Sequence, residues 1–339
     1  MRRTSSPAGS SPSTGSGVIL LALLLQVADS LPPKPAAPPA AWLHLIGAYS
    51  SANDTVYVYE DGGALMALAS PAAPLRLAPV SDSVFTLAGR GVDHPQIVFR
   101  QGELQIGAVI RRRLQLGPAQ GEGGQLRLKP VGSVAELLRV DRKLRPPAES
   151  GAFLAADLVE PATLDTTIRL DIRYATTNNF LGSVFYPAAR AFLQRPAAQA
   201  LVRASRVLRP LGYGLLIHDA YRPWYVTKVF WDATPVESRW LVANPARGSK
   251  HNRGAAVDIT LYDLATGAPI EMPSTYDEAT VRALSNYPGG TSLQRWHRAL
   301  LRRVLEAEGF TVNPTEWWHF DYRDWQRYQI QNVPFVRIR

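Results

Sequence analysis

The stretch Ser249-Lys-His-Asn-Arg-Gly-Ala-Ala-Val-Asp258 runs from a polar loop into an apolar strand predicted over residues 257–262. Asp258 is flanked by apolar residues in that strand, and a carboxylate there is costly unless it faces a polar partner or a metal. A turn at Gly254 would bring His251 back beside Asp258. The stretch therefore indicates a His–Asp site at the mouth of a sheet, with a loop histidine and a strand-end aspartate as the alternative.

A second stretch, Glu316-Trp-Trp-His319, follows about sixty residues later. Two histidines and one aspartate form a three-ligand set of the kind that binds zinc with one position open, which leaves Glu316 to act as a base. Taken alone, His319 is also typical of a packed core histidine. Side chains three residues apart point to opposite faces of a regular strand. Glu316 and His319 therefore share a site only if the backbone is irregular, which Pro314 permits.

The composition limits the chemistry that the chain can perform. Its 339 residues are enough for two domains, and 46% hydrophobic against 19% charged residues is typical of a globular protein. There is no cysteine, which excludes disulfides, thiolate ligands and a lipid-anchoring cysteine. The net charge is +9, but the basic residues are scattered and only Arg111-Arg112-Arg113 forms a run. We interpret that run as a solvated face and expect no nucleic-acid partner.

The N-terminus has the pattern of a secretory signal. Arg2 and Arg3 precede the apolar run Val18–Leu25, and Ala28-Asp-Ser30 is a small-residue cleavage site. The run is shorter than the roughly 20 residues that a membrane span needs, although a retained anchor is the alternative. We expect a signal peptide over 1–30, a proline-rich linker over 31–41, export to the periplasm, and no stable membrane insertion after cleavage.

Residues 42–140 are predicted to form a small all-β antiparallel accessory domain, a barrel or sandwich. The turn Asp61-Gly62-Gly63 indicates a hairpin. The segment resembles the small β module appended to some serine β-lactamase-like hydrolases. His44 and His94 are interpreted as structural histidines. Strands are expected at 55–60, 64–68, 75–77, 84–87, 96–100, 103–110 and 125–128, with a short helix at 134–140.

After a linker over 141–151, residues 152–339 are predicted to fold as an α+β domain, with helices on one side of a mainly antiparallel sheet. Strands are expected at 168–174, 213–218, 257–262 and 310–320. Pro196 and Gly212 bracket one helix, and a second is predicted to be capped by Ser292, to run to Glu308 and to stop at Gly309. His297 on that second helix is interpreted as structural.

Arg222 follows the buried strand 213–218, at a position typical of functional loops. Its guanidinium would donate to a carbonyl oxygen that becomes negative during hydrolysis. The alternative is a strand-end salt bridge with Asp219. His218 would orient this loop or be structural.

From about Asp157 to Trp325 the chain resembles the zinc D-Ala-D-Ala dipeptidases of the vancomycin-resistance type. The resemblance rests on three blocks, supported by Arg173-Tyr-Ala-Thr and Leu261-Tyr262. The blocks are S-x-H-x-x-G-x-A-x-D from Ser249, E-W-W-H from Glu316 and D-x-Y-R-P from Asp219. The chain departs from the family in its N-terminal β domain and in a shortened stretch between Pro223 and Ser249.

The resemblance implies one Zn²⁺ per chain and assigns a role to each matching residue. His251, Asp258 and His319 match the zinc ligands, Glu316 the catalytic base and Arg222 the arginine that stabilises the transition state. Asp277 matches an aspartate that binds the substrate's amino group, and Ser249 and Trp317 match pocket residues. From the sequence alone, Asp277 is equally the N-cap of a short helix.

The expected function is zinc-dependent hydrolysis of free D-Ala-D-Ala to two D-Ala in cell-wall peptide metabolism. A peptidoglycan D,D-carboxypeptidase of the same fold is the alternative enzyme. A non-catalytic cell-wall binding protein with structural zinc is a third interpretation, against which Glu316 and Arg222 both argue. The expected partner is a small D-dipeptide, and the sequence leaves the oligomeric state open.

Overall fold

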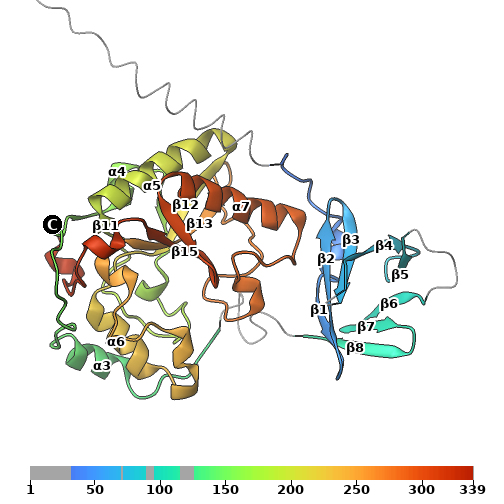
Figure 1. Ribbon diagram of the computed structural model, residues 1–339, viewed down its shortest axis with the longest axis horizontal. Helices are drawn as coiled ribbons and strands as arrows, with labels where there is room; N and C mark the ends of the chain where they lie inside the picture. The colour runs from blue at the N-terminus through green and yellow to red at the C-terminus, as the bar shows by residue number, and fades with distance from the viewer. Residues whose placement is uncertain (1–31, 70–71, 89–94, 115–125, 339) are drawn as a thin grey trace, which may run out of the picture. The chain divides into compact units, whose positions relative to one another are not determined.

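The computed structural model describes residues 32–69, 72–88, 95–114 and 126–338 (Figure 1). The predicted signal peptide and His94 lie outside these residues. Within the described ranges, no helix combines the length and the apolar character that crossing a membrane requires.

The predicted small β domain is a closed barrel of eight antiparallel strands, in which each strand pairs with the next and the last pairs with the first (Figure 1). Its interior is filled by side chains such as Leu65, Phe85 and Leu104, which are fully buried. The strands are β1 (Gly47–Ser50), β2 (Thr55–Asp61), β3 (Ala64–Ala69), β4 (Leu75–Pro79), β5 (Val84–Leu87), β6 (Ile97–Arg100), β7 (Glu103–Ile106) and β8 (Val109–Arg113).

Glycines set the tight turns of this barrel. Gly62 and Gly63 both have positive φ, as a two-residue hairpin turn requires, and they form the predicted connection between β2 and β3. Gly107 also has positive φ and splits the single strand expected over 103–110 into β7 and β8. The strand expected over 125–128 is wrong, because residues 126–128 are not in a strand.

The second part of the chain is built on a five-stranded sheet of order β10-β12-β13-β15-β14. Only β10 and β12 are parallel, so the sheet is mainly antiparallel as predicted. The sheet strands are β10 (Arg169–Leu170), β12 (Tyr213–Asp219), β13 (Ala256–Asp263), β14 (Phe310–Asn313) and β15 (Glu316–Tyr322), and a separate pair consists of β9 (Leu158–Val159) and β11 (Leu193–Gln194).

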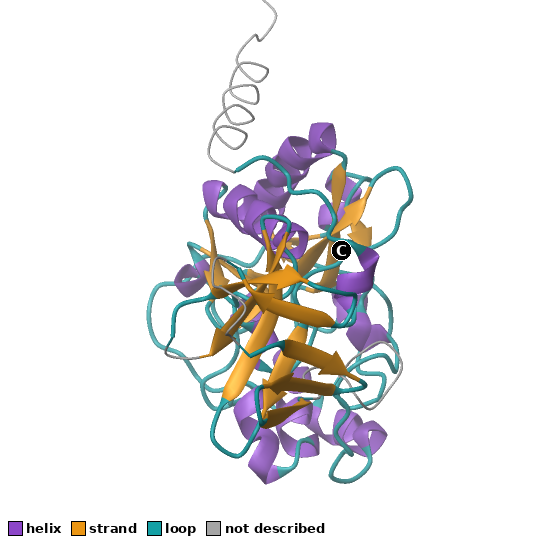
Figure 2. Ribbon diagram, turned by 90° about the vertical axis from the view of Figure 1, so that its right-hand side faces the viewer, coloured by secondary structure: helices purple, strands orange, loops and turns teal. Residues whose placement is uncertain are grey.

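The helices are distributed differently from the prediction. Helices α5 and α7 contact each other and strands of the sheet, whereas α6 contacts α3 and lies apart from them (Figures 1 and 2). The prediction of helices on one side of the sheet therefore holds for α5 and α7 but not for α6. The helices are α2 (Ala40–Leu43), α3 (Val134–Asp141), α4 (Pro161–Leu164), α5 (Arg195–Leu208), α6 (Trp224–Ala233) and α7 (Ser292–Ala307).

Two local predictions are corrected by tertiary contacts. The strand expected over 168–174 is reduced to β10, because Tyr174 is buried among aromatic rings and the chain turns into a short 3-10 helix there. The N-cap of α7 is Thr291, whose side chain accepts from the backbone of Gln294. Ser292 instead donates its hydroxyl to Glu60 of β2 (3.1 Å).

The segment between the barrel and β9 is in contact with the second part of the chain. Helix α3 packs against α6. The carboxylate of Glu149 accepts from the Arg253 guanidinium and from the backbone N–H of Ile330. Residues in the expected linker over 141–151 therefore contribute to the packing of the sheet domain.

Candidate active site

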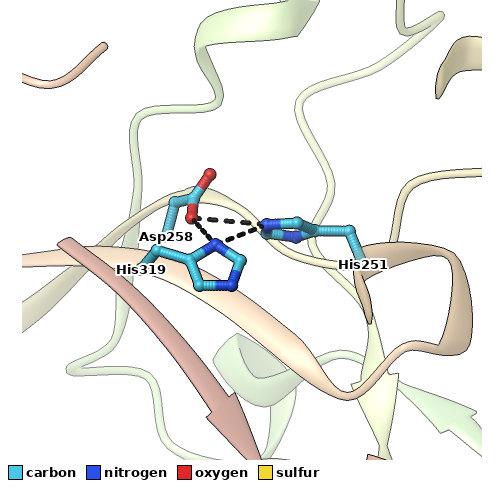
Figure 3. A group of neighbouring side chains, drawn as sticks. All are labelled: His251, Asp258 and His319. Atoms are coloured by element: carbon cyan, nitrogen blue, oxygen red, sulfur yellow. Dashed lines mark hydrogen bonds and ion pairs between the residues drawn. The ribbon is translucent and has the colours of Figure 1, made fainter. Parts of the chain in front are cut away.

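Three side chains from separate parts of the chain converge at one point (Figure 3). Their ligand atoms all lie within 4.8 Å of one another. His319 Nδ1 lies 3.0 Å from Asp258 Oδ1 and 3.1 Å from His251 Nε2. His251 Nε2 lies 3.3 Å from the same carboxylate oxygen. Two imidazole nitrogens and one carboxylate oxygen aimed at a common point are a donor set suited to zinc.

Local backbone structure delivers His251 to this point. Ser249 caps the 3-10 helix η5 (Lys250–Arg253), its hydroxyl accepting from the backbone N–H of His251. Gly254 then adopts a positive φ of 66°, and a Cβ at this position would meet Leu158 at 2.4 Å. The turn predicted at Gly254 thus reverses the chain into β13 and places His251 beside Asp258.

Asp258 and His319 face each other directly. They are Cα partners in the antiparallel pairing of β13 with β15, which puts their side chains on the same face of the sheet. The second oxygen of Asp258 accepts from the Tyr276 hydroxyl (2.9 Å). This bond holds the carboxylate with its other oxygen toward the histidines.

The outer nitrogens of both histidines are also held. His251 Nδ1 lies 2.7 Å from the carbonyl oxygen of Ala220. Because a carbonyl oxygen can only accept, Nδ1 carries the hydrogen, and the lone pair of Nε2 is left to coordinate a metal. His319 Nε2 lies 3.0 Å from Asp321 Oδ1. Asp321 in turn pairs with Lys250. Such outer contacts fix the tautomer and orientation of metal ligands.

The electrostatics of the cluster favour a positive charge at its centre. Burial opposes ionisation of Asp258, but the adjacent His251 and His319 outweigh it and hold the pKa of Asp258 well below its usual range. Burial would lower the pKa of His319, yet its hydrogen bonds to Asp258 and Asp321 raise that pKa to about 10. The carboxylates that favour the charged form of His319 would also favour a metal cation held between the two histidines.

Glu316 reaches the same site although it precedes His319 by three residues. Its Oε2 lies 3.8 Å from His319 Nδ1 and accepts from the Asn313 side chain (3.0 Å). The pairing of β14 with β15 is irregular between Val312 and Asn313, which is the departure from a regular strand that the sequence required. Desolvation in the site, reinforced by the Asp258 carboxylate, raises the pKa of Glu316 above its usual range.

Arg222 forms the strand-end salt bridge that the sequence left open, and it also lines the cavity. Its guanidinium donates to Asp219 Oδ2 through Nε (3.0 Å) and Nη2 (2.7 Å), which is the predicted strand-end salt bridge. It also lies over the rings of Phe230 (4.7 Å) and Tyr174 (5.2 Å) and lines the cavity that contains His251. The salt bridge therefore fixes the guanidinium at the cavity wall.

Asp277 is a half-buried carboxylate that lines the cavity, not a helix N-cap. No helix begins there; the nearest is the 3-10 helix Val281–Ala283, which Thr280 caps. Asp277 has φ of +59°, an uncommon conformation for a residue other than glycine, and accepts from the Tyr174 hydroxyl (3.1 Å). Desolvation and the Asp258 and Glu316 carboxylates raise its pKa well above the usual range.

These residues line one cavity of about 980 Å³. Its lining includes the three convergent side chains and also Glu316, Arg222, Asp277 and Ser249. Trp317 does not line it: this side chain is buried and donates to Ser274 (2.8 Å), whereas its neighbour Trp318 lines the cavity. Trp318 therefore replaces the predicted Trp317 among the residues that substrate can reach.

Three supporting residues were missed from the sequence. Tyr174 and Tyr276 carry no sequence signal for their contacts with Asp277 and Asp258, because these contacts depend on how separate segments pack in the fold. Asp321 did carry one, since it lies two residues after His319 and so on the same face of a strand. His218 stacks on Tyr276 and His297 contacts Tyr213, so neither joins the convergent ligands.

Comparison with known families adds to this geometry. The sequence pattern of the D-ala-D-ala dipeptidase family matches residues 155–337, which is more than half of the chain. The chain belongs to this family. As a member of the dipeptidase family, it is 32% identical over 165 residues to a D-alanyl-D-alanine dipeptidase of Escherichia coli (strain K12), a match covering 49% of this chain and 84% of the relative.

A D-alanyl-D-alanine dipeptidase of Enterococcus faecalis (strain ATCC 700802 / V583) is 33% identical over 175 residues, covering 46% of this chain and 87% of the relative. One from Enterococcus faecium is 32% identical over 175 residues, with the same two shares. The dipeptidase-family match begins at residue 155, so it leaves out the barrel and the segment that follows it.

Proposed function

We propose that this protein is a zinc dipeptidase that hydrolyses free D-alanyl-D-alanine to two molecules of D-alanine in cell-wall peptide metabolism. Membership of the D-ala-D-ala dipeptidase family supports the reaction. The single structural observation that carries the proposal is the convergence of His251, Asp258 and His319 beside the carboxylate of Glu316. Together they supply a metal site and a base in one cavity.

The proposed metal ligands are His251 Nε2, His319 Nδ1 and Asp258 Oδ1. Neutral imidazole and carboxylate in this combination fit zinc, and the cluster favours a cation at its centre. When bound, zinc would supply Lewis-acid polarisation of the scissile carbonyl and acidification of water. Asp321 and Tyr276 hold the outer sides of this ligand set.

Glu316 is proposed to act as the general base and then the general acid. A carboxylate whose pKa is raised toward the working pH is better able to accept a proton from water and return it to the leaving amine. Asn313 donates to Glu316 Oε2 and limits its orientation. Because Glu316 is not one of the three proposed ligands, its carboxylate remains available for proton transfer.

Arg222 and Asp277 are proposed to bind two groups of the substrate, the scissile carbonyl oxygen and the ammonium group. The guanidinium of Arg222, fixed by Asp219, would donate to the carbonyl oxygen as negative charge develops there. Asp277 would pair with the substrate's ammonium group, whose positive charge would also keep the Asp277 carboxylate ionised. Ser249 is proposed as a further substrate contact, since it lines the same cavity.

The role of Asp277 separates a dipeptidase from a D,D-carboxypeptidase of the same fold. A carboxypeptidase substrate has an acylated amine at this position and offers no ammonium to a carboxylate. The test is to incubate the zinc-loaded protein, with a chelator-treated control, with D-Ala-D-Ala and with a peptidoglycan pentapeptide. The proposal expects metal-dependent release of D-alanine from the dipeptide; release from the pentapeptide alone would favour the carboxypeptidase.

We further propose that the protein acts in the periplasm, after cleavage of the predicted signal peptide over 1–30. The sequence predicts an accessory domain over 42–140 and a dipeptidase domain over 152–339, and we propose this division with one change. The contacts of α3 and Glu149 support counting residues 126–151 with the dipeptidase domain in any truncated protein.

A further inference from the structure

The segment 329–338, which follows the sheet in the chain, is bonded to both parts of the chain that deliver site residues. The backbone N–H of Gln331 donates to the carbonyl of Asn252 (2.8 Å), and the Gln331 carbonyl accepts from the backbone N–H of Trp224 (3.0 Å). Asn252 belongs to η5, and Trp224 begins α6 directly after the loop that carries Arg222. One residue of the segment therefore bridges the two.

Further hydrogen bonds attach the same segment on both sides of Arg222. The Tyr221 hydroxyl donates to the carbonyl of Val333 (3.1 Å) and accepts from the backbone N–H of the same residue (2.8 Å). The side-chain oxygen of Asn332 accepts from the backbone N–H of Tyr225 (2.9 Å). The backbone that carries Arg222 is thus held before and after this residue by one segment.

Phe335 extends these contacts to the guanidinium itself. Its side chain is only 2% exposed, and its ring packs against the rings of Tyr186 and Phe192, with centroids 4.8 Å and 5.2 Å away. The Tyr186 hydroxyl donates to Asp219 Oδ1 (2.7 Å), whereas Arg222 donates to Oδ2 of the same carboxylate. Phe335 therefore supports the ring that orients the partner of Arg222.

The place of this guanidinium depends on the packing behind it. One oxygen of Asp219 is bound by Tyr186 and the other by Arg222, so the carboxylate cannot rotate without breaking a bond. Asp219 is buried, which leaves little solvent to replace a lost bond. Because a misplacement of about 1 Å can cost about 100-fold in rate, a contact far from the substrate can matter to turnover.

We propose that segment 329–338 positions Arg222 for catalysis, with Phe335 setting the place of the guanidinium through Tyr186 and Asp219. Phe335 does not line the cavity, so it is a positioning residue and not a catalytic one. This inference rests on the proposed dipeptidase function, in which Arg222 stabilises the developing oxyanion.

The variants that test it are Phe335→Ala and Phe335→Leu. The leucine variant keeps most of the apolar volume, so it remains informative if the alanine variant fails to fold. The matched control is Val336→Ala, because Val336 is the next residue on the same 3-10 helix, η8 (Phe335–Arg337), and is 80% exposed. Zinc content is measured for every variant and should stay at the wild-type value.

The first readout needs no turnover. It is the hydrogen exchange of Arg222 Nε–H, followed by NMR, with the signal assigned by its absence from Arg222→Lys. This hydrogen donates to Asp219 and is buried, so it should exchange slowly in the wild type. Relative to backbone amides of β13, which report global unfolding, its exchange should be at least about tenfold faster in both Phe335 variants. Val336→Ala should match the wild type.

The second readout is kcat of the full zinc-loaded chain for D-Ala-D-Ala. Phe335→Ala should lower kcat by about 100-fold, and Phe335→Leu by less. In an Arg222→Lys chain, which has no guanidinium to position, Phe335→Ala should lower kcat by less than about twofold. A general structural role for Phe335 would instead make the two losses multiply.

The inference is overturned if both Phe335 variants leave the exchange of Arg222 Nε–H at its wild-type rate, or if the losses in kcat multiply. A wild-type chain that leaves D-Ala-D-Ala uncleaved would reject the dipeptidase proposal. The exchange rates would still decide whether Phe335 positions Arg222, so the two failures are distinguishable.

Discussion

Replacing Asp321 tests how the proposed metal site is held together. Its carboxylate lies 3.0 Å from His319 Nε2, is only 8% exposed and is the outer partner of a proposed ligand. Removing such a partner typically weakens metal binding by about 10–100-fold, or about 1.4–2.7 kcal/mol. Because the bond is buried, solvent would not replace it fully. We therefore expect Asp321→Ala to lie toward the upper end of this range.

Asp321→Asn should have a smaller effect, near the lower end of that range. The amide oxygen can still accept from His319 Nε2, but it lacks the negative charge that makes the imidazole a stronger ligand. The assay is the zinc dissociation constant at neutral pH, measured by competition with a chromophoric chelator. Asp324→Asn is the control, since this more exposed carboxylate contacts Arg327 and not the site.

Zinc affinity should therefore fall in the order wild type, Asp321→Asn, Asp321→Ala, because the first change removes only the charge and the second removes the hydrogen bond as well. Zinc dissociation constants for both Asp321 variants within about twofold of the wild type would refute the reasoning, since an outer partner is worth at least about tenfold. Activity need not be measured, so the result stands apart from any effect on turnover.

Asp277→Asn should lower kcat/KM for D-Ala-D-Ala by roughly 100-fold or more, because the substrate's ammonium loses its counter-charge, and should weaken discrimination against N-acetyl-D-Ala-D-Ala. Asparagine tolerates the positive φ at this position, so zinc content should hold; wild-type kinetics would remove Asp277 from the site. Burial lowers the pKa of His297 to about 4, so between about pH 6.5 and 4 the unfolded chain takes up this proton and the folded chain does not. Stability should therefore fall between about pH 6.5 and 4, by roughly 2 kcal/mol after allowance for solvent screening. His297→Gln should flatten this decline in urea unfolding, and an unchanged slope would contradict the assignment. A chain beginning at residue 126 should keep D-Ala-D-Ala hydrolysis. One beginning at Gly151 loses both helix α3 and Glu149, the ion-pair partner of Arg253, and should be less stable by at least about 3 kcal/mol; equal melting temperatures would show that neither contact contributes to stability.

The sequence predicted the parts of the fold that depend on local pattern. The turn at Gly62 and Gly63, the strand 84–87 and the strand carrying Asp258 each follow from short-range signals, and each is confirmed. The approach of His251 to Asp258 could also be predicted from the sequence, because Gly254 permits the required reversal of the chain.

What the sequence did not predict depends on contacts between distant segments. Tyr174 ends its strand early because aromatic rings from other loops surround it. The positive φ of Asp277 and its bond to Tyr174 follow from the packing of two loops about a hundred residues apart. Which of Trp317 and Trp318 faces the cavity depends on the irregular pairing of β14 with β15, which no periodic pattern encodes.

The most direct test of the central claim separates the proposed base from the proposed ligands. Glu316→Ala should bind zinc with the wild-type stoichiometry of one per chain, because the three ligands remain. Its kcat for D-Ala-D-Ala should fall by about 10²–10⁴-fold, the usual contribution of a general base. His319→Ala, measured alongside, should lose the zinc. A Glu316→Ala variant with full zinc content and near-normal kcat would contradict the account.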